Sequence, residues 1–394
     1  MVDAENSEAT IFVSIASYRD KLCSQTISDL FQQAALPQRI FVGVCEQNRI
    51  DEKDELCDAF STDIQGPQFM QWWHTHCQYI RLDASQARGP TWARYWCMQL
   101  FHNQDYVFQI DSHTRFVQHW DVKLLTMINQ LHKAGFPRAV LSHYCDTVDR
   151  FQENDTEKDD GLITVITTIQ KEPTSGVLHF RGAEYLPRLT YPRRHALVGG
   201  GMLFLPRQAV IDVPFDPLLY DLFFGEEILY SIRLWTHGYD VFSPNINIVY
   251  HTYVRSAEPK YWDDRNLDMS AALKHVQDIL HGNSKQGLGH IRTMDAFWSY
   301  LEVPTLTDWP DGKDFRIPER LLHPTSLSKE GYTVYACCKG NSISFARSFY
   351  LSALLFVLAI SIAIIIVVSV IRSRRHDVTS RRTHTRALDK FHKR

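Results

Sequence analysis

The sequence of 394 residues lacks features that define several common protein classes. None of its eight cysteines belongs to a CxxC pair, so a structural zinc site built from paired cysteines is not expected. The cysteines are scattered, and Cys45 and Cys97 lie in apolar stretches, which is typical of reduced thiols in a protein core. Disulfide bonds among the eight stay open at this point.

Most of the chain also lacks net positive charge. Residues 372–394 contain nine Lys or Arg against Asp377 and Asp389, a net charge of +7, so the total of -3 leaves -10 on residues 1–371. Proteins that bind nucleic acids need clustered Lys and Arg to contact phosphates. We therefore expect no nucleic-acid partner.

A long apolar run is absent until the end of the chain. The polar and acidic residues 1–10 contain no apolar region of a secretory signal. Residues 348–371 carry no charge, are bracketed by Arg347 and Arg372, and are long enough to cross a bilayer of about 30 Å. We predict a single transmembrane helix there, preceded by an irregular, Pro-containing stem at 301–347 and followed by the basic tail.

Two membrane topologies stay open. The basic tail favours a cytoplasmic C-terminus, which would place the larger part of the protein on the lumenal side of the endoplasmic reticulum or Golgi, or outside the cell. The missing signal favours a tail-anchored protein whose larger part is cytosolic. We give the cytosolic alternative slightly more weight.

Residues 11–300 alternate between strand-like and helix-like patterns, and we assign them to one catalytic domain. Apolar, β-branched strands are expected at 11–16, 39–45, 79–82, 106–110 and 139–143, and helices at 23–35 and from Thr91 to Leu100. A strand–helix–strand order requires parallel strands joined by a right-handed crossover. The predicted fold class is therefore an α/β sandwich.

A triplet of polar residues ends the strand at 106–110. Asp111-Ser112-His113 lies where an open α/β sheet binds ligands, just past the carboxyl end of a strand. Residues i and i+2 of an extended segment point to the same side, so Asp111 and His113 could share one divalent cation. The alternative is that Asp111 caps a turn and His113 is an ordinary surface histidine.

Three later segments carry further candidate residues. The glycines at 199–201 predict close approach of a ligand or of other backbone, or else a bulge or tight turn. Glu226 and Glu227 begin a predicted helix, where they either complement the helix dipole or accept hydrogen bonds from a substrate hydroxyl. His251 follows a predicted strand at 246–250, and such a lone histidine is usually structural.

Together these segments resemble the GlcNAc-transferase family of GT-A fold glycosyltransferases. The best-known activity of that family is a cytoplasmic polypeptide α-N-acetylglucosaminyltransferase that acts on hydroxyproline. The similar stretches occur in the family's order over about residues 10–265, at 11–20, 39–44, 87–94, 109–116, 223–227 and 233–240. The polypeptide GalNAc-transferases are similar more distantly, through an Asp-x-His motif.

The resemblance implies a Rossmann-like GT-A mixed sheet flanked by helices and a UDP-GlcNAc donor held through a divalent cation, typically Mn²⁺. It implies that Asp111, His113 and His251 bind the metal. Glu226 and Glu227 match an acidic pair that faces the acceptor, a hydroxyl on a protein or a glycan. They would position it if the reaction retains the anomeric configuration, as is described for the family, and one would be the base if it inverts.

Three arginines are candidates for binding the nucleotide-sugar alongside Asp111. Arg19, Arg88 and Arg94 lie in the matched stretches, and a guanidinium group binds phosphate through two parallel hydrogen bonds. The alternative for each is an ordinary ion pair. A metal ion between the phosphates would neutralise the charge that develops on the nucleoside diphosphate as it leaves.

Two other functions compete with glycosyl transfer. One is a catalytically inactive membrane protein that kept the fold and binds a nucleotide-sugar or carbohydrate, and the presence of all the candidate residues speaks against it. The other is a metal-dependent hydrolase that uses the same triplet. A hydrolase would need further ligands, for which His119 and Asp121 are the nearest candidates.

Overall fold

The computed structural model of the protein describes most of its first 327 residues, all within one compact unit at residues 1–333. The described ranges are 8–60, 62–151, 160–173, 175–255, 258–265, 267–324 and 326–327. No helix in these ranges is long and apolar enough to cross a membrane. The transmembrane helix predicted at 348–371 and the basic tail lie outside the described residues.

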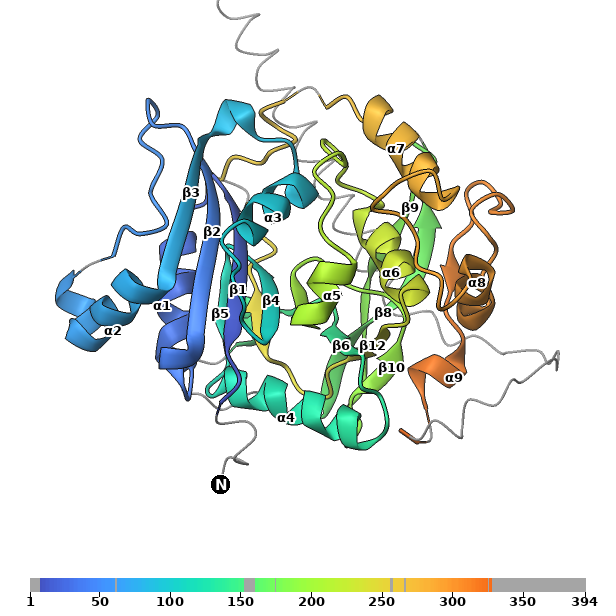
Figure 1. Cartoon of the computed structure of the whole chain (residues 1–394), viewed down its shortest axis with the longest axis horizontal. Coiled ribbons are helices and arrows are strands. Elements are labelled where there is room, and N and C mark those ends of the chain that lie inside the picture. Colours follow the sequence, from blue (N-terminus) through green and yellow to red (C-terminus); the bar gives the residue numbers. More distant parts are fainter. Residues whose placement is uncertain are drawn as a thin grey trace, which may run out of the picture. The chain divides into compact units, whose positions relative to one another are not determined.

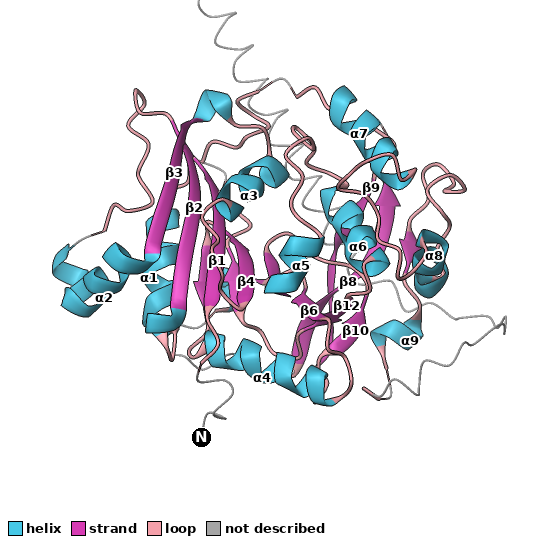
Figure 2. Cartoon of the chain, in the orientation of Figure 1, coloured by secondary structure: helices cyan, strands magenta, loops and turns pink. Residues whose placement is uncertain are grey.

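An eight-stranded mixed sheet forms the centre of this unit, in the order β10-β12-β6-β11-β4-β1-β2-β3 (Figure 2). Its strands are β1 (Ile11–Tyr18), β2 (Ile40–Asn48), β3 (Cys77–Asp83), β4 (Tyr106–Asp111), β6 (Ala139–Ser142), β10 (Arg193–His195), β11 (Met202–Pro206) and β12 (Asp240–Ser243). β1 runs parallel to β2 and β4, whereas β11 runs antiparallel between β4 and β6. The predicted α/β fold with a mixed sheet is confirmed.

Helices cover both faces of the sheet (Figure 1). The described helices are α1 (Cys23–Gln33), α2 (Thr62–His76), α3 (Pro90–Met98), α4 (Trp120–Lys133), α5 (Arg207–Asp212), α6 (Glu226–Thr236), α7 (Ser270–Leu280), α8 (Met294–Leu301) and α9 (Glu319–Leu322). Strand β1 is buried on both sides, because Ile11 packs with α1 and α4 while Phe12 packs toward α3. This two-sided burial explains why β1 reads as a continuous apolar run.

Two smaller sheets complete the unit. One contains β5 (Thr114–Phe116), β13 (Val249–His251) and β7 (Asp146–Thr147), and the other contains β14 (Phe315–Arg316), β8 (Leu162–Lys171) and β9 (Leu178–Pro187). In the first, β13 runs antiparallel to β5 with His251 opposite Thr114. This register brings the end of β13 next to the turn that follows β4.

The structure differs from the stem predicted to begin at residue 301. Trp309, Ile317 and Leu322 are at most 3% exposed and pack into the same apolar cluster as Ile163 and Val165 of β8. Strand β14 also pairs with β8. The folded unit therefore extends past the predicted boundary, because the proline-containing segment supplies large apolar side chains that cover the β8–β9 hairpin.

The cysteines divide into two groups. Cys23, at the start of α1, forms a disulfide with Cys57. The other cysteines in the described ranges are free, and among them Cys45 and Cys97 are buried, as their apolar surroundings predicted. The disulfide is a pairing that the sequence had left open.

Candidate active site

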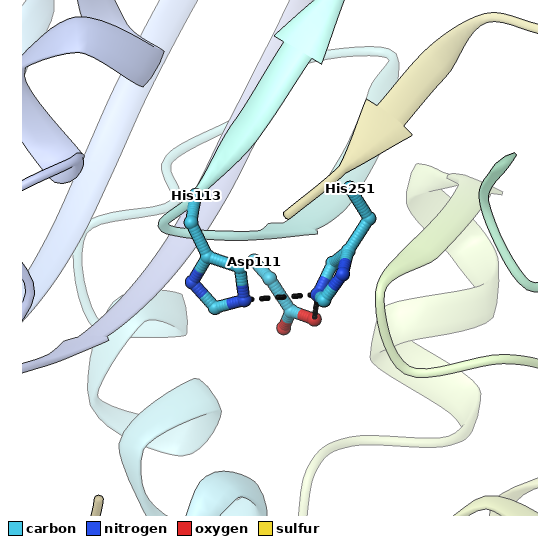
Figure 3. A group of neighbouring side chains, drawn as sticks. All are labelled: Asp111, His113 and His251. Atoms are coloured by element: carbon cyan, nitrogen blue, oxygen red, sulfur yellow. Dashed lines mark hydrogen bonds and ion pairs between the residues drawn. The ribbon is translucent and has the colours of Figure 1, made fainter. Parts of the chain in front are cut away.

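The side chains of Asp111, His113 and His251 converge at the carboxyl end of β4 (Figure 3). The Nε2 atoms of the two histidines are 2.9 Å apart, and His251 Nε2 is 3.0 Å from Asp111 Oδ2. One ligand atom from each residue lies within 4.8 Å of the others. Three donor atoms that point at one space form a group that can hold a metal ion.

Strand geometry explains this convergence. Asp111 ends β4, and Ser112 and His113 form the turn before β5, so this segment is a turn and not the extended chain that was expected. The side chains of Asp111 and His113 still converge on one space (Figure 3). β13 then places His251 opposite Thr114, and the Thr252 N–H donates to the carbonyl of His113 at 3.1 Å. The third candidate ligand is thus held by backbone pairing 138 residues away in the chain.

Asp20, a buried carboxylate, accepts a hydrogen bond from Nδ1 of His113 at 2.7 Å. This bond keeps the proton on Nδ1 and leaves Nε2 with a free lone pair, the form that binds metals. Burial lowers the pKa of His113 and outweighs the opposing effect of Asp20. The histidine is therefore neutral near pH 7, as a ligand must be.

The chemistry of the three donors fits a divalent cation such as Mn²⁺, which accepts imidazole nitrogen and carboxylate oxygen. Burial alone would raise the pKa of Asp111, but the hydrogen bond with His251 and the positive charge of Arg94 hold it well below its usual range. Nδ1 of His251 is buried and has no hydrogen-bond partner among the described residues. A proton on that nitrogen would leave Nε2 of His251 free to bind the cation.

A cleft opens beside Asp111, with about 610 Å³ of space that is partly open to solvent. The residues lining it are Ala16, Tyr18, Gln47, Gly89, Pro90, Ala93, Arg94, Asp111, Phe223, Arg255, Pro259, Lys260, Tyr261 and Trp262. Arg94, Arg255 and Lys260 supply positive charge. Phe223 and Trp262 are partly exposed, with ring centroids 4.6 Å apart. The cleft thus combines cations, a carboxylate and aromatic faces.

The three predicted arginines have different surroundings. Arg94 lines the cleft and forms a buried ion pair with Glu226. Arg19 is 8% exposed, forms ion pairs with Glu52, Asp54 and Asp264, and is not among the residues lining the cleft.

Arg88 is exposed, and within the described part of the chain its side chain has no hydrogen bond or ion pair. It precedes Gly89, which lines the cleft. Of the three arginines, the structure brings only Arg94 into the same cleft as Asp111.

Glu226 and Glu227 begin α6, as predicted, and neither of them lines the cleft. Glu226 accepts hydrogen bonds from Arg94 and from the Thr91 hydroxyl. Glu227 accepts the Gly200 N–H and the Tyr144 hydroxyl, each at 2.6 Å. Burial and the neighbouring charge of Glu226 raise the pKa of Glu227 to about 7.

The three glycines before β11 lie in tight surroundings. A Cβ atom at Gly200 would approach Arg94 to 2.7 Å, and one at Gly201 would lie 3.0 Å from Asp111 Oδ2. Larger side chains would therefore displace Arg94 or Asp111. Both predictions for this segment hold: the Met202 N–H donates to the Gly199 carbonyl across a tight turn at 3.4 Å, and a Cβ atom at Gly199 would lie 2.7 Å from the carbonyl oxygen of His143.

Sequence reasoning missed two residues of the site, Asp20 and Arg255. Arg255 lines the cleft and donates to Asp20 Oδ2 at 3.1 Å. Asp20 lies in the loop after β1, beside the loop after β4, because β1 and β4 are parallel neighbours. A carboxylate just past the carboxyl end of an adjacent strand was a signal that could have identified Asp20.

The further ligands suggested for a hydrolase lie elsewhere. Asp121 is in the first turn of α4, and its carboxylate accepts the backbone N–H groups of Ala35 and Leu36. His119 precedes α4, is exposed, and has a left-handed backbone conformation. Neither residue belongs to the group formed by Asp111, His113 and His251.

Comparison with known protein families assigns the chain to a class, the glycosyltransferases. The pattern of one family, Glycosyltransferase (GlcNAc), matches residues 10–75 and 61–286. This match covers more than half of the chain, and the protein belongs to that family. No curated protein matches the chain.

Several solved structures show a distant likeness to the chain. A crystal structure of GalNAc-T7 with UDP, GalNAc and Mn²⁺ is 15% identical over 68% of this chain, with a TM-score of 0.46. The chain spans about half the length of that protein, covering 48% of it. A crystal structure of S. aureus TarS 1–349 in complex with UDP-GlcNAc is 12% identical over 70% of this chain and 72% of TarS, with a TM-score of 0.39.

Proposed function

We propose that the protein is a metal-dependent glycosyltransferase that moves GlcNAc from UDP-GlcNAc onto a hydroxyl of a protein or glycan, with retention of the anomeric configuration. The observation that carries this proposal is the convergence of Asp111, His113 and His251 beside a cationic cleft. Membership of the Glycosyltransferase (GlcNAc) family supports the choice of donor sugar.

Asp111, His113 and His251 are the residues that would hold the cation. A bound divalent cation would supply positive charge against the nucleoside diphosphate that leaves when the sugar is transferred. Asp111 is the member of the group that lines the cleft, so the cation would lie at the cleft wall.

The cationic side chains of the cleft suit the phosphates of the donor. Arg94, Arg255 and Lys260 can donate hydrogen bonds to phosphate oxygens, and such charge-assisted bonds are stronger than neutral ones. Phe223 and Trp262 offer partly exposed aromatic faces against which the base or a sugar ring can pack.

We assign Glu226 and Glu227 to shaping this cleft. Glu226 holds Arg94 in place, and Glu227 holds the backbone N–H of Gly200. A reaction with retention needs no general base from the protein to activate the acceptor. Because both glutamates lie behind the cleft wall, shaping the cleft suits them better than direct proton transfer.

The membrane anchor and the location of the catalytic unit stay proposals. We propose that residues 348–371 anchor the protein in a membrane. The disulfide between Cys23 and Cys57 supports the lumenal or outer side over the cytosolic side, because disulfides persist in oxidising compartments. Protease protection of the tail and of the catalytic unit in sealed microsomes would separate the two topologies.

The test of the proposed function is a donor screen with the purified protein. UDP release is measured across UDP-sugars in the presence of Mn²⁺, with peptide and glycan acceptors, and is repeated with EDTA. We expect the fastest release with UDP-GlcNAc and its loss in EDTA. Asp111→Ala should lower turnover at least 100-fold, because it removes a metal ligand at the cleft wall.

Asp121→Asn is the matched control, since Asp121 is a buried carboxylate away from the cleft. It should keep wild-type turnover. Turnover that survives EDTA, or that survives Asp111→Ala, would overturn the metal-dependent mechanism. Binding of UDP-GlcNAc without any turnover would support the alternative of an inactive binding protein.

A further inference from the structure

Asp20 occupies a central place beside the candidate metal site. It follows β1 at the carboxyl edge of the sheet and is 2% exposed. Its Oδ1 accepts the Leu22 N–H at 3.0 Å. Its Oδ2 accepts bonds from the Ser112 hydroxyl at 2.8 Å, His113 Nδ1 at 2.7 Å and Arg255 Nη1 at 3.1 Å. One buried oxygen thus contacts three side chains of the site.

Asp20 is not one of the three converging ligands. It contacts the ring nitrogen of His113 that points away from His251, so it acts on the ligand from behind. A carboxylate in this position fixes the tautomer and orientation of a histidine and makes its other nitrogen a better donor to a cation. The Ser112 hydroxyl, in the middle of the Asp-Ser-His triplet, braces the same carboxylate oxygen.

Oδ2 of Asp20 also accepts a hydrogen bond from a positively charged side chain of the cleft wall, that of Arg255. Arg255 lines the cleft, and its side chain is 16% exposed while that of Asp20 is 1% exposed. Arg255 lies four residues after His251, so the chain from β13 returns to the site that β13 helps to form. Asp20 therefore connects one metal ligand with one group that can bind an anion in the cleft.

We propose that Asp20 is a positioning residue that couples the cation site to the anion-binding wall of the cleft. Its carboxylate orients His113 toward the cation and Arg255 toward the donor phosphates. The cation and the nucleoside diphosphate then bind to a prearranged site, in which His113 and Arg255 are already oriented by Asp20. This inference rests on the proposed function, and its test separates the two.

The first measurement is the affinity for Mn²⁺ without nucleotide. The full-length protein is titrated, and electron paramagnetic resonance reports the concentration of free Mn²⁺. We expect Asp20→Asn to weaken Mn²⁺ binding about 10–100-fold, the range found when a carboxylate behind a ligand histidine is changed. Asp121→Asn, which also alters a buried carboxylate, should bind Mn²⁺ like the wild type.

The second measurement is UDP affinity by calorimetry, at Mn²⁺ concentrations that saturate each variant. Arg255→Ala should keep Mn²⁺ affinity within about twofold of the wild type, because Arg255 is no ligand, yet weaken UDP binding about 10-fold or more, as expected for loss of one charge-assisted bond. Asp20→Asn should weaken both. Raising the Mn²⁺ concentration should restore part of its turnover, which a purely structural defect would not allow.

The outcomes separate the two proposals. Wild-type Mn²⁺ affinity in Asp20→Asn, with the melting temperature unchanged, overturns the positioning role and leaves the proposed metal site intact. A wild-type protein that binds no Mn²⁺ overturns the metal site itself, and the role of Asp20 with it. If Asp20→Asn melts early, Asp20→Ser replaces it, because it also removes the carboxylate, and unchanged Mn²⁺ and UDP affinities in that folded variant also overturn the proposal.

Discussion

Buried carboxylates hold the cationic and ligand side chains of this site in place. Asp20 contacts His113 and Arg255, and Glu226 contacts Arg94. An Arg or His side chain pointing into a cleft is free to rotate unless a partner restrains it. At the scale of the residue, the site therefore consists of groups that face the cleft or the candidate metal position and of carboxylates behind them.

Glu227, one of the carboxylates behind the cleft, makes the stability of the folded protein depend on pH. Burial and the charge of Glu226 raise its pKa from 4.5 to about 7 in the folded protein. The folded state then binds more protons than the unfolded state between these values, so Glu227 contributes stability that is complete below about pH 4.5 and is lost as the pH rises through 7.

We expect Glu227→Gln to reduce the fall in stability between pH 5 and pH 7. The amide resembles the protonated acid and cannot ionise. The difference in slope approaches about 1.4 kcal/mol per pH unit, the value for one proton. Urea unfolding of both proteins at several pH values measures it. Parallel stability curves for the two proteins would show that Glu227 is ionised in the folded state throughout this range.

At the scale of the element, the start of α1 lies directly behind the metal site. The Thr26 hydroxyl of α1 donates to the carbonyl of Ser112 at 2.8 Å and accepts the N–H of Thr114 at 3.0 Å. Cys23, in the first turn of the helix, is joined to Cys57 across a separation of 34 residues. The disulfide thus restrains the helix that supports the turn after β4.

Reduction of this disulfide should lower the free energy of unfolding by roughly 2–4 kcal/mol, since a closed loop of this size restricts the unfolded chain. Urea unfolding with and without a thiol reductant measures the effect. A Cys23→Ser, Cys57→Ser double variant is the control and should be insensitive to the reductant. A wild-type unfolding curve that is the same with and without the reductant would mean that Cys23 and Cys57 are not joined in the protein.

The elements that sequence alone predicted are those with strong local patterns. β1 and β4 are continuous apolar runs, and the triplet after β4 could be placed at the edge of the sheet. The antiparallel register of β5 and β13, which brings His251 to Asp111, depends on pairing between distant segments. The contact between Asp20 and His113 likewise arises only when β1 and β4 lie side by side. The position of Asp20 just past β1 is visible in the sequence, but neither contact can be derived from a local pattern.

The predicted end of the folded unit at residue 300 was wrong for another reason. Prolines and weak periodicity made residues 301–347 resemble a stem, because irregular segments leave no period for a pattern to follow. Trp309, Ile317 and Leu322 were visible as apolar residues, but their partners on β8 and β9 lie more than 100 residues earlier. Long-range packing decides where this unit ends.

At the scale of the whole molecule, this packing determines which fragment can fold. Arg193 of β10 is 1% exposed and donates to the Leu322 carbonyl at 2.8 Å. A chain ending at residue 300 would leave that guanidinium without this acceptor and would expose the apolar face of the β8–β9 hairpin. Loss of each large buried side chain costs about 2–5 kcal/mol, against a total stability of about 5–15 kcal/mol for a typical domain.

We therefore expect a fragment of residues 1–327 to melt cooperatively and to bind Mn²⁺, and a fragment of residues 1–300 to do neither. Circular dichroism during heating and Mn²⁺ titration measure the two properties. The single variant Trp309→Ala in the longer fragment should lower the melting temperature by several degrees without changing Mn²⁺ affinity, because Trp309 packs in the cluster with β8 and α8 and not at the metal site. Equal melting temperatures for the two fragments would show that the catalytic unit ends at residue 300 and that residues 301–327 do not contribute to its stability.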